Sequence, residues 1–163
     1  MNDRERLTAW AAEHGPAVFG FLRRRCGQDA EDLLQETFRK AWASRAAYQP
    51  SGRDRAFLIT IADRLACDWA RKRAGRKTVA LEEAVDGGGG PEDRLAANED
   101  RTMVREILTT LPDAQRRTLE LRYFGDLTFK EIADALGCPL NTALSHAHRG
   151  LEALRQRLAE RSP

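Results

Sequence analysis

The sequence contains few of the residues from which metal sites, disulfides and membrane spans are built. Its 163 residues include three cysteines, Cys26, Cys67 and Cys138, and three histidines. The cysteines form no CxxC pair or Cys/His cluster, which argues against a zinc site and predicts reduced, mostly packed thiols. No stretch approaches the roughly 20 apolar residues of a membrane span. The first residues, MNDRERLTAWAAEHG, lack the apolar core of a signal peptide. We therefore expect a cytoplasmic protein without membrane insertion.

The usual signatures of an enzyme are also missing. The glycine run at residues 87–90 is not followed by GK[ST], and no strand-like stretch precedes it, so it is not a phosphate loop. We find no nucleophile triad and no metal cluster, and the carboxylates occur on predicted exposed helix faces beside basic residues. The sequence predicts no catalytic residue, no metal and no cofactor.

What the chain has is helix-forming sequence with an uneven charge distribution. Hydrophobic residues make up 42% and charged residues 32%, as in a helix-rich globular protein, and the net charge is only +2. Residues 53–77 hold eight arginines and lysines against three aspartates, whereas residues 81–100 hold seven acidic residues against one arginine. This asymmetry is expected when one segment contacts phosphate and the next does not. An ordinary solvated helix face followed by a solvated loop is the alternative.

Apolar residues at helical spacing predict a first domain over residues 1–75. The expected helices span residues 3–14, 16–26, 29–48 and 54–75. Gly15 and Pro16 are expected to separate the first two, and Gly27 to close the second. The core side of the last helix is expected to hold Phe57, Leu58, Ile61, Leu65, Ala66 and Trp69.

A change of character follows at residues 76–96, which contain four consecutive glycines and then Pro91. Such a run behaves as flexible chain, so this segment is predicted to be a linker. The second domain is then residues 97–163. Its first helix is expected to begin near Leu95 and to stop before Pro112, and another is expected over residues 113–124. Because no stretch has strand periodicity, the fold class is all-α, with two small helical domains.

Residues 127–158 have the pattern of a helix-turn-helix. Thr128 and Glu131 have the spacing of a capping box, and Gly137 suits the left-handed residue that ends a helix. Pro139 prevents the preceding residue from staying helical and favours a new helix from Leu140. The second helix of such a motif can enter the major groove of DNA. A helical hairpin without a DNA role is the alternative.

Three segments together resemble a known family. DLLQETFRKAW at 32–42, RAFLITIADRLACDWARKR at 55–73 and LPDAQRRTLELRYFGDLTFKEIADALG at 111–137 are similar to bacterial RNA polymerase sigma factors of the extracytoplasmic-function (ECF) type of the sigma-70 family. These proteins keep only conserved regions two and four. The resemblance implies a factor that binds core RNA polymerase, through its beta-prime and beta subunits, and directs transcription from promoter DNA. It also suggests an anti-sigma factor as a further partner, because such a protein commonly clamps the two domains in this family.

The resemblance also assigns residues to roles. Docking on the polymerase beta-prime subunit is implied for Asp32, Gln35, Glu36, Arg39 and Lys40. Binding and opening of the minus-ten element is implied for Arg53, Arg55, Thr60, Arg64, Cys67, Asp68 and Arg71. Recognition of the minus-thirty-five element is implied for Asn141, Thr142, Leu144, Ser145, His146 and Arg149.

Departures from the family pattern occur at three of these positions. Leu144 and His146 stand where the family usually has Lys and Arg, and Arg64 stands where it usually has Asn. Fewer permanent cations would weaken phosphate anchoring, and Arg can pair with guanine edges. We therefore expect an altered promoter preference with weaker reliance on the minus-thirty-five element. A free-standing helix-turn-helix regulator that binds duplex DNA without polymerase is the alternative function.

Overall fold

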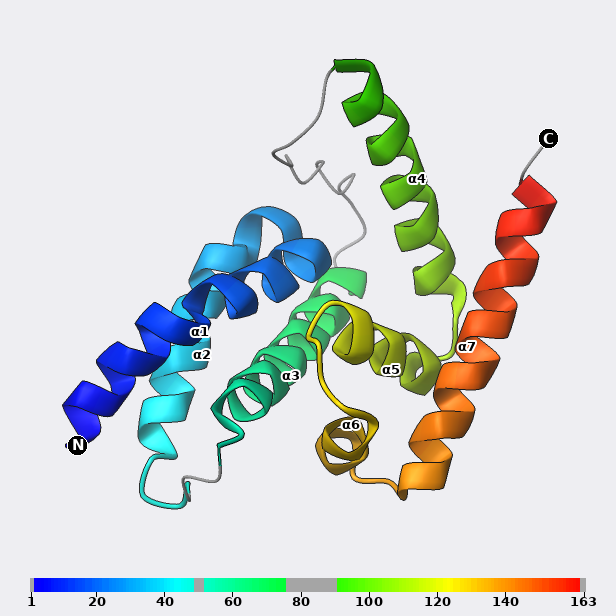
Figure 1. Ribbon diagram of the computed structural model, residues 1–163. Helices are drawn as coiled ribbons and strands as arrows, with labels where there is room; N and C mark the ends of the chain where they lie inside the picture. Colours follow the sequence, from blue (N-terminus) through cyan, green and yellow to red (C-terminus); the bar gives the residue numbers. More distant parts are fainter. Residues whose placement is uncertain (1, 49–51, 76–90, 162–163) are drawn as a thin grey trace. The chain divides into compact units, whose positions relative to one another are not determined.

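The computed structural model describes residues 2–48, 52–75 and 91–161, and for residues 91–98 it describes the backbone only. Across these residues the structure is helical and has no strand (Figure 1), which confirms the all-α prediction. The chain divides into two compact units, Met1–Ala84 and Val85–Pro163, and each is described by itself. Within the described ranges, no helix combines the length and the apolar composition that a membrane span requires.

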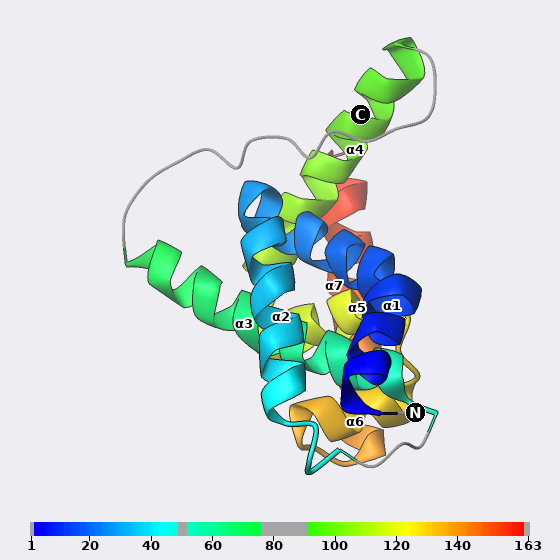
Figure 2. The ribbon, with the colours of Figure 1, turned by 90° about the vertical axis from the view of Figure 1, so that its left-hand side faces the viewer.

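The first unit is built from three long helices. They are α1 (Asp3–Cys26), α2 (Ala30–Ala43) and α3 (Asp54–Ala74), with a 3-10 turn η1 (Gly27–Asp29) between α1 and α2. Each of the three packs against the other two, and α1 and α2 lie side by side in both ribbon views (Figures 1 and 2). The core between them consists mainly of Trp10, Val18, Phe21, Leu22, Leu58 and Ile59, all buried.

The predicted break at Gly15 and Pro16 is wrong, because α1 continues through both residues. A proline inside a helix removes one backbone donor, so its cost is local. Trp10 lies before the proline and Val18 and Phe21 after it, and all three are buried in the same core. Packing on both sides of Pro16 thus keeps the helix continuous. The predicted stop at Gly27 is confirmed, since Gly27 adopts φ 57° and caps α1.

The end of α2 also differs from the prediction. The helix stops at Ala43, whereas it was expected to reach residue 48. The chain turns instead, and Tyr48 packs on two aromatic rings: its centroid lies 5.2 Å from that of Trp10 and 4.4 Å from that of Phe57. This aromatic cluster joins the turn that follows α2 to the N-terminal halves of α1 and α3.

The bounds of α3 agree with the prediction, but its buried side agrees only in part, since Leu58 and Ala66 are buried as expected and the other four residues are not. Phe57, Ile61, Leu65 and Trp69 are only half-buried, although the pattern placed them in the core. The fully buried positions are mostly small or polar ones, namely Ala56, Ala62, Asp63, Ala66 and Cys67, together with Leu58 and Ile59. Small residues allow α1 and α2 to approach this side of α3, so the large side chains are displaced toward its edges.

The second unit contains α4 (Pro91–Thr110), α5 (Asp113–Tyr123), α6 (Phe129–Leu136) and α7 (Leu140–Arg161). Helix α4 begins at Pro91, so residues 91–96 of the predicted linker are helical, and residues 76–90 lie outside the described part. Helix α7 packs against each of α4, α5 and α6. Leu108, Leu111 and Leu119 form a buried cluster against which Val104, Phe124 and Leu151 pack.

The helix-turn-helix forms as predicted, and its local chemistry is confirmed. Thr128 Oγ1 accepts from the Glu131 N–H, and a Glu131 carboxylate oxygen accepts from the Thr128 N–H, each at 3.2 Å. Gly137 is left-handed at φ 68°, and the Cys138 N–H donates to the Ala133 carbonyl at 3.0 Å. This is the Schellman arrangement that ends a helix. It sets the turn from which α7 starts at Leu140.

Candidate polymerase and nucleic-acid interfaces

The five residues assigned to polymerase docking lie together on α2, and we call them the α2 face. Helix α2 buries Ala30, Thr37 and Ala41 on its opposite side. Of the α2 face, Asp32, Gln35, Arg39 and Lys40 are exposed and Glu36 is half-buried. Arg39 forms an ion pair with Glu36 one turn away, and its own side chain is 78% exposed. The structure therefore brings the predicted residues onto one solvent-facing surface that carries both acidic and basic groups.

Four of the residues assigned to the minus-ten element lie along the outer side of α3. Arg64, Asp68 and Arg71 are exposed, and Thr60 is half-buried with its hydroxyl donating to the Ala56 carbonyl at 2.6 Å. Asp68 pairs with Arg71 at 3.3 Å, so part of the positive charge is balanced within this α3 face. Two others, the exposed Arg53 and the half-buried Arg55, lie at the start of the helix.

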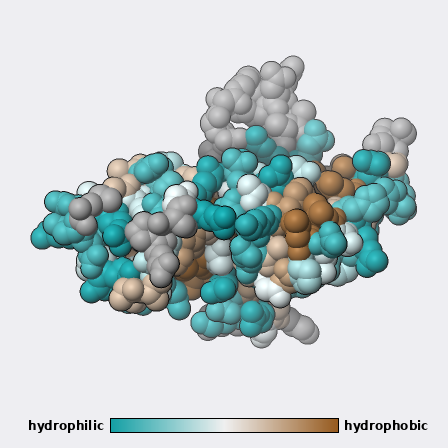
Figure 3. Space-filling model, turned by 60° about the horizontal axis from the view of Figure 1, so that its bottom comes forward, coloured by the Kyte–Doolittle hydropathy of each residue, from teal (hydrophilic) through white to brown (hydrophobic). Residues whose placement is uncertain are grey.

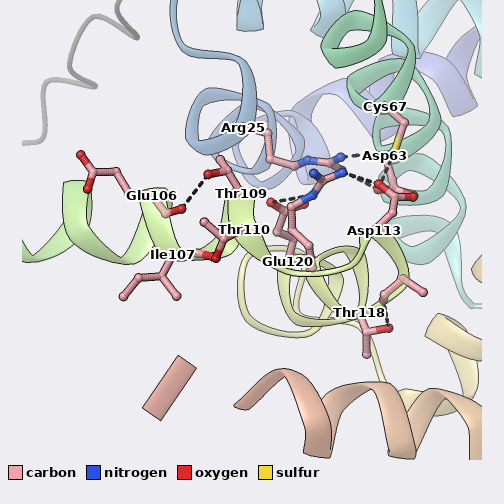
Figure 4. A network of polar contacts seen from close by, with 12 residues as sticks. Arg25, Asp63, Cys67, Glu106, Ile107, Thr109, Thr110, Asp113, Thr118 and Glu120 are labelled. Atoms are coloured by element: carbon pink, nitrogen blue, oxygen red, sulfur yellow. Dashed lines mark hydrogen bonds and ion pairs between the residues drawn. The ribbon is translucent and has the colours of Figure 1, made fainter. Parts of the chain in front are cut away.

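Cys67 does not belong to this surface. Its side chain is buried, with the sulfur 3.9 Å from Asp63 Oδ1 and 3.4 Å from an Arg25 guanidinium nitrogen. Arg25 donates to Asp63 in an ion pair whose side chains are 6% and 0% exposed (Figure 4). The family resemblance had assigned Cys67 to the minus-ten surface together with the exposed residues of α3. The side of α3 that is buried in the structure includes Cys67.

Sequence reasoning missed this buried ion pair, although a signal was present. Asp63 and Cys67 are four residues apart, so they share one side of a helix, and that side also carries Ala56, Ala62 and Ala66. A carboxylate among alanines needs a charged partner when it is buried. Arg25, at the end of α1, is that partner. The pair fixes the end of α1 against the middle of α3.

The basic end of α3 is fixed by a second set of contacts that the sequence did not reveal. The Trp69 indole N–H donates to Asp29 Oδ2 at 2.7 Å, and Arg73 reaches the same oxygen at 3.4 Å. The Arg73 guanidinium also stacks over the Trp69 ring, 4.8 Å from its centroid. Asp29 in η1 therefore positions the last two turns of α3, where its basic residues lie.

The residues assigned to the minus-thirty-five element lie at the start of α7. Asn141, Leu144, Ser145 and Arg149 are exposed, whereas Thr142 and His146 are half-buried at the edge of this α7 face. Two residues that the prediction omitted are also exposed there, Leu140 and His148. They follow from the spacing, because Leu140, Leu144 and His148 are each one turn apart. The opposite side, Ala143, Ala147 and Gly150, is buried.

Helix α5 supports both helices of the helix-turn-helix. Arg122 at the end of α5 donates to the Leu127 carbonyl at 2.9 Å, and its guanidinium lies 5.0 Å from the centroid of the Phe129 ring. Gly150 allows close approach of α7 to α5: a Cβ added there would lie 3.0 Å from Leu119 Cδ1. The α7 face is thus supported by the packing of α7 on α4, α5 and α6. Among the described residues, no three His, Cys, Asp or Glu side chains are grouped to hold a metal ion.

Comparison with known proteins gives matches along most of the chain. The family model described as Sigma-70 region 2 matches residues 10–76, and the model described as Sigma-70, region 4 matches residues 101–154. RNA polymerase sigma factor CarQ of Myxococcus xanthus is 36% identical over 157 residues, covering 91% of this chain and 87% of the relative. The ECF RNA polymerase sigma factor SigK of Mycolicibacterium vanbaalenii is 29% identical over 163 residues, covering 96% and 83%.

A solved structure shares the fold. The sigma factor RpoE, crystallised in complex with the anti-sigma factor NepR from Bartonella quintana, is similar with a TM-score of 0.72 at 21% identity, covering 95% of this chain and 98% of that one. The α2 and α3 faces fall within the region 2 match, and the α7 face falls within the region 4 match. A free-standing regulator gains no support from these matches. The chain belongs to the ECF sigma factors of the sigma-70 family, which direct RNA polymerase to promoters at transcription initiation.

Proposed function

We propose that the two units divide the work of promoter recognition. Residues 1–75 dock on core RNA polymerase and open the minus-ten element, and residues 97–163 bind the minus-thirty-five element. Residues 76–96 connect the two, and residues 91–96 of this segment belong to α4. The observation that most supports this assignment is that each predicted surface lies on an exposed helix face within the matching sigma region.

The α2 face is the proposed docking surface for the polymerase beta-prime subunit. Asp32 and Gln35 are exposed there, and the Glu36 carboxylate already forms an ion pair with Arg39. A polymerase surface rich in arginine would offer these carboxylates the same kind of partner. An exposed pair between Arg39 and Glu36 contributes little to folding. Exchanging it for a pair with the polymerase therefore costs little, and complementary charge favours fast and specific association.

The α3 face is the proposed minus-ten surface. Arg64 and Arg71 can follow the phosphate backbone, and the half-buried Ile61 lies on the same side of the helix. Cations combined with apolar side chains suit single-stranded DNA, where bases stack and phosphates are neutralised. Cys67 is not part of this proposal, because its thiol is buried beside Asp63.

The α7 face is the proposed minus-thirty-five surface. Asn141, Ser145 and Arg149 supply hydrogen-bond donors and acceptors at the start of the second helix, where base edges are contacted in this motif. Leu144 brings no charge, and His146 is half-buried. Fewer phosphate contacts lower both the affinity and its dependence on salt. We therefore propose weaker reliance on the minus-thirty-five element than in relatives with Lys and Arg at these positions.

The remaining parts of the proposal follow from membership of the family. The protein acts in the cytoplasm as a dissociable subunit of RNA polymerase and catalyses no reaction itself. An anti-sigma factor that covers the α2 face is the proposed regulator, since RpoE of Bartonella quintana has been crystallised with such a protein.

The test is run-off transcription with core RNA polymerase on genomic DNA fragments, with and without the protein. We expect promoter-specific transcripts that require the protein and that disappear when Asp32, Gln35 and Glu36 are replaced by alanine. The matched control is Glu13→Ala, which removes an exposed carboxylate from α1, outside the α2 face. The control should transcribe normally. Equal activity of the triple variant and the wild type would overturn the assignment of the α2 face.

A further inference from the structure

Two leucines at the start of α7 are unusually open to solvent. Leu140 is 47% exposed and Leu144 is 42% exposed. In the described part of the chain, only Phe19 and Tyr123 are other large hydrophobic side chains with comparable exposure. Figure 3 shows a largely hydrophilic surface on which apolar side chains emerge in patches. Two exposed leucines in consecutive turns of one helix therefore need a reason.

Core packing does not supply that reason. Leu140 and Leu144 are four residues apart and share one stripe, whereas α7 packs through Ala143 and Ala147 on another side. The leucine stripe lies beside a polar stripe formed by Asn141, Ser145 and Arg149, all exposed. The two stripes together make one continuous surface at the N-terminal half of α7. This is the part of the second helix of a helix-turn-helix that contacts base edges.

A leucine side chain has no donor or acceptor, so it cannot bind phosphate or the polar edge of a base. The major groove presents one apolar group, the C5-methyl of thymine. We propose that Leu140 and Leu144 contact thymine methyl groups in the minus-thirty-five element, while Asn141 and Ser145 hydrogen-bond to neighbouring bases. This inference rests on the proposed role of the α7 face. It makes both leucines determinants of sequence preference, and at Leu144 this apolar contact replaces the cation that the family usually has.

The test uses holoenzyme, made from core RNA polymerase and the full chain, on a promoter mapped by run-off transcription. Each thymine of the upstream element is replaced singly by deoxyuridine, which removes the methyl group and keeps every hydrogen-bonding group. We expect one or two of these replacements to weaken promoter binding about fourfold each, as expected for one buried methyl group. In Leu144→Ala, binding to the thymine template should fall by a similar factor. The same variant should no longer distinguish thymine from deoxyuridine at one position.

Two further variants separate this contact from general effects. Leu144→Met keeps an apolar side chain on a helix-forming residue, so it should keep the sensitivity to the methyl group. Phe19→Ala removes an exposed apolar side chain from the first unit and should leave that sensitivity unchanged. Alanine is the best helix former, so Leu144→Ala should preserve α7.

The outcomes distinguish this inference from the proposal on which it rests. If base-pair changes upstream weaken binding but no deoxyuridine does, the leucine contact is wrong and the role of the α7 face stands. If no upstream base-pair change matters, the proposed role of the α7 face fails, and this inference fails with it. If Leu144→Ala weakens binding to core polymerase itself, equally on all templates, the leucines contact protein and the inference is overturned.

Discussion

The ion pair between Arg25 and Asp63 provides a quantitative test of how the first unit is held together. Its side chains are 6% and 0% exposed, and it joins the end of α1 to the middle of α3. In Asp63→Ala the guanidinium stays buried without the Asp63 carboxylate. Breaking a buried pair from one side costs about 3 to 5 kcal/mol. A helical unit of this size has a total stability of roughly 5 to 10 kcal/mol, so the variant should be close to unfolding.

The assay is urea unfolding followed by tryptophan fluorescence. The three tryptophans of the chain, Trp10, Trp42 and Trp69, all belong to the first unit, so the signal reports on that unit in the full-length protein. The double variant Arg25→Met with Asp63→Ala removes both charges. Its loss of stability should be smaller than the sum of the losses in the two single variants, because each single variant leaves one buried charge without its partner and the double variant leaves none.

The matched control is Asp68→Ala, five residues further along α3. Its ion pair with Arg71 has side chains that are 56% and 77% exposed. An exposed pair is worth about 0 to 1 kcal/mol, so the control should barely shift the urea midpoint. Either of two results would show that the buried pair does not hold α1 against α3. In the first, Asp63→Ala loses no more stability than Asp68→Ala. In the second, the double variant loses as much stability as the two single variants together.

Three further predictions concern the rest of the fold and the DNA surface. Thr128→Ala removes the side-chain cap of α6 and should cost about 1 kcal/mol, measured as faster hydrogen exchange in α6 without change in α1. Gly150→Val should destabilise the second unit by about 1 to 3 kcal/mol through its clash with Leu119, measured as faster exchange in α5 and α7. The control Gly20→Ala has open space around it and should stabilise α1 by up to about 1 kcal/mol. Arg64→Asn should leave the fold intact and shift the minus-ten base preference away from guanine in run-off assays on promoter libraries, whereas unchanged preference would separate Arg64 from base recognition.

The parts of the fold that depend on local chemistry were predictable from the sequence. The capping box at Thr128, the left-handed Gly137 and the helix start after Pro139 each involve residues within one turn of one another. Their effect does not depend on what the rest of the chain does. The helix-turn-helix and the bounds of α3 were therefore predicted correctly.

The errors occur where tertiary packing overrides a local signal. Pro16 is a helix breaker by sequence, yet α1 continues through it because its apolar residues on both sides enter one core. The side of α3 that is buried was misassigned because large apolar residues were given priority. Besides Leu58 and Ile59, the structure buries the side of α3 that carries Ala62, Ala66 and Cys67, so Cys67 does not reach the surface.

Among the residues of the functional surfaces, too, some could be predicted from the sequence and others could not. The resemblance assigned the residues of the α2 face, and their helical spacing places all five on one side of α2, as the structure shows. On α7, spacing alone also places Leu140 and His148 with the assigned residues, but the prediction followed the family motif and omitted them. The contacts of Asp29 with Trp69 and Arg73 join residues 40 and 44 positions apart, and no periodicity could indicate them.

The most direct test of the central claim is a footprint of holoenzyme on a promoter that the protein activates. We expect protection of two elements, with thymines near minus ten becoming reactive to permanganate as the duplex opens. Replacing Arg64 and Arg71 by alanine should abolish the opening, and replacing Asn141 and Arg149 should remove only the upstream protection. Protection of a single palindromic site by the protein alone, unchanged by core polymerase and without opening of the duplex, would contradict the account.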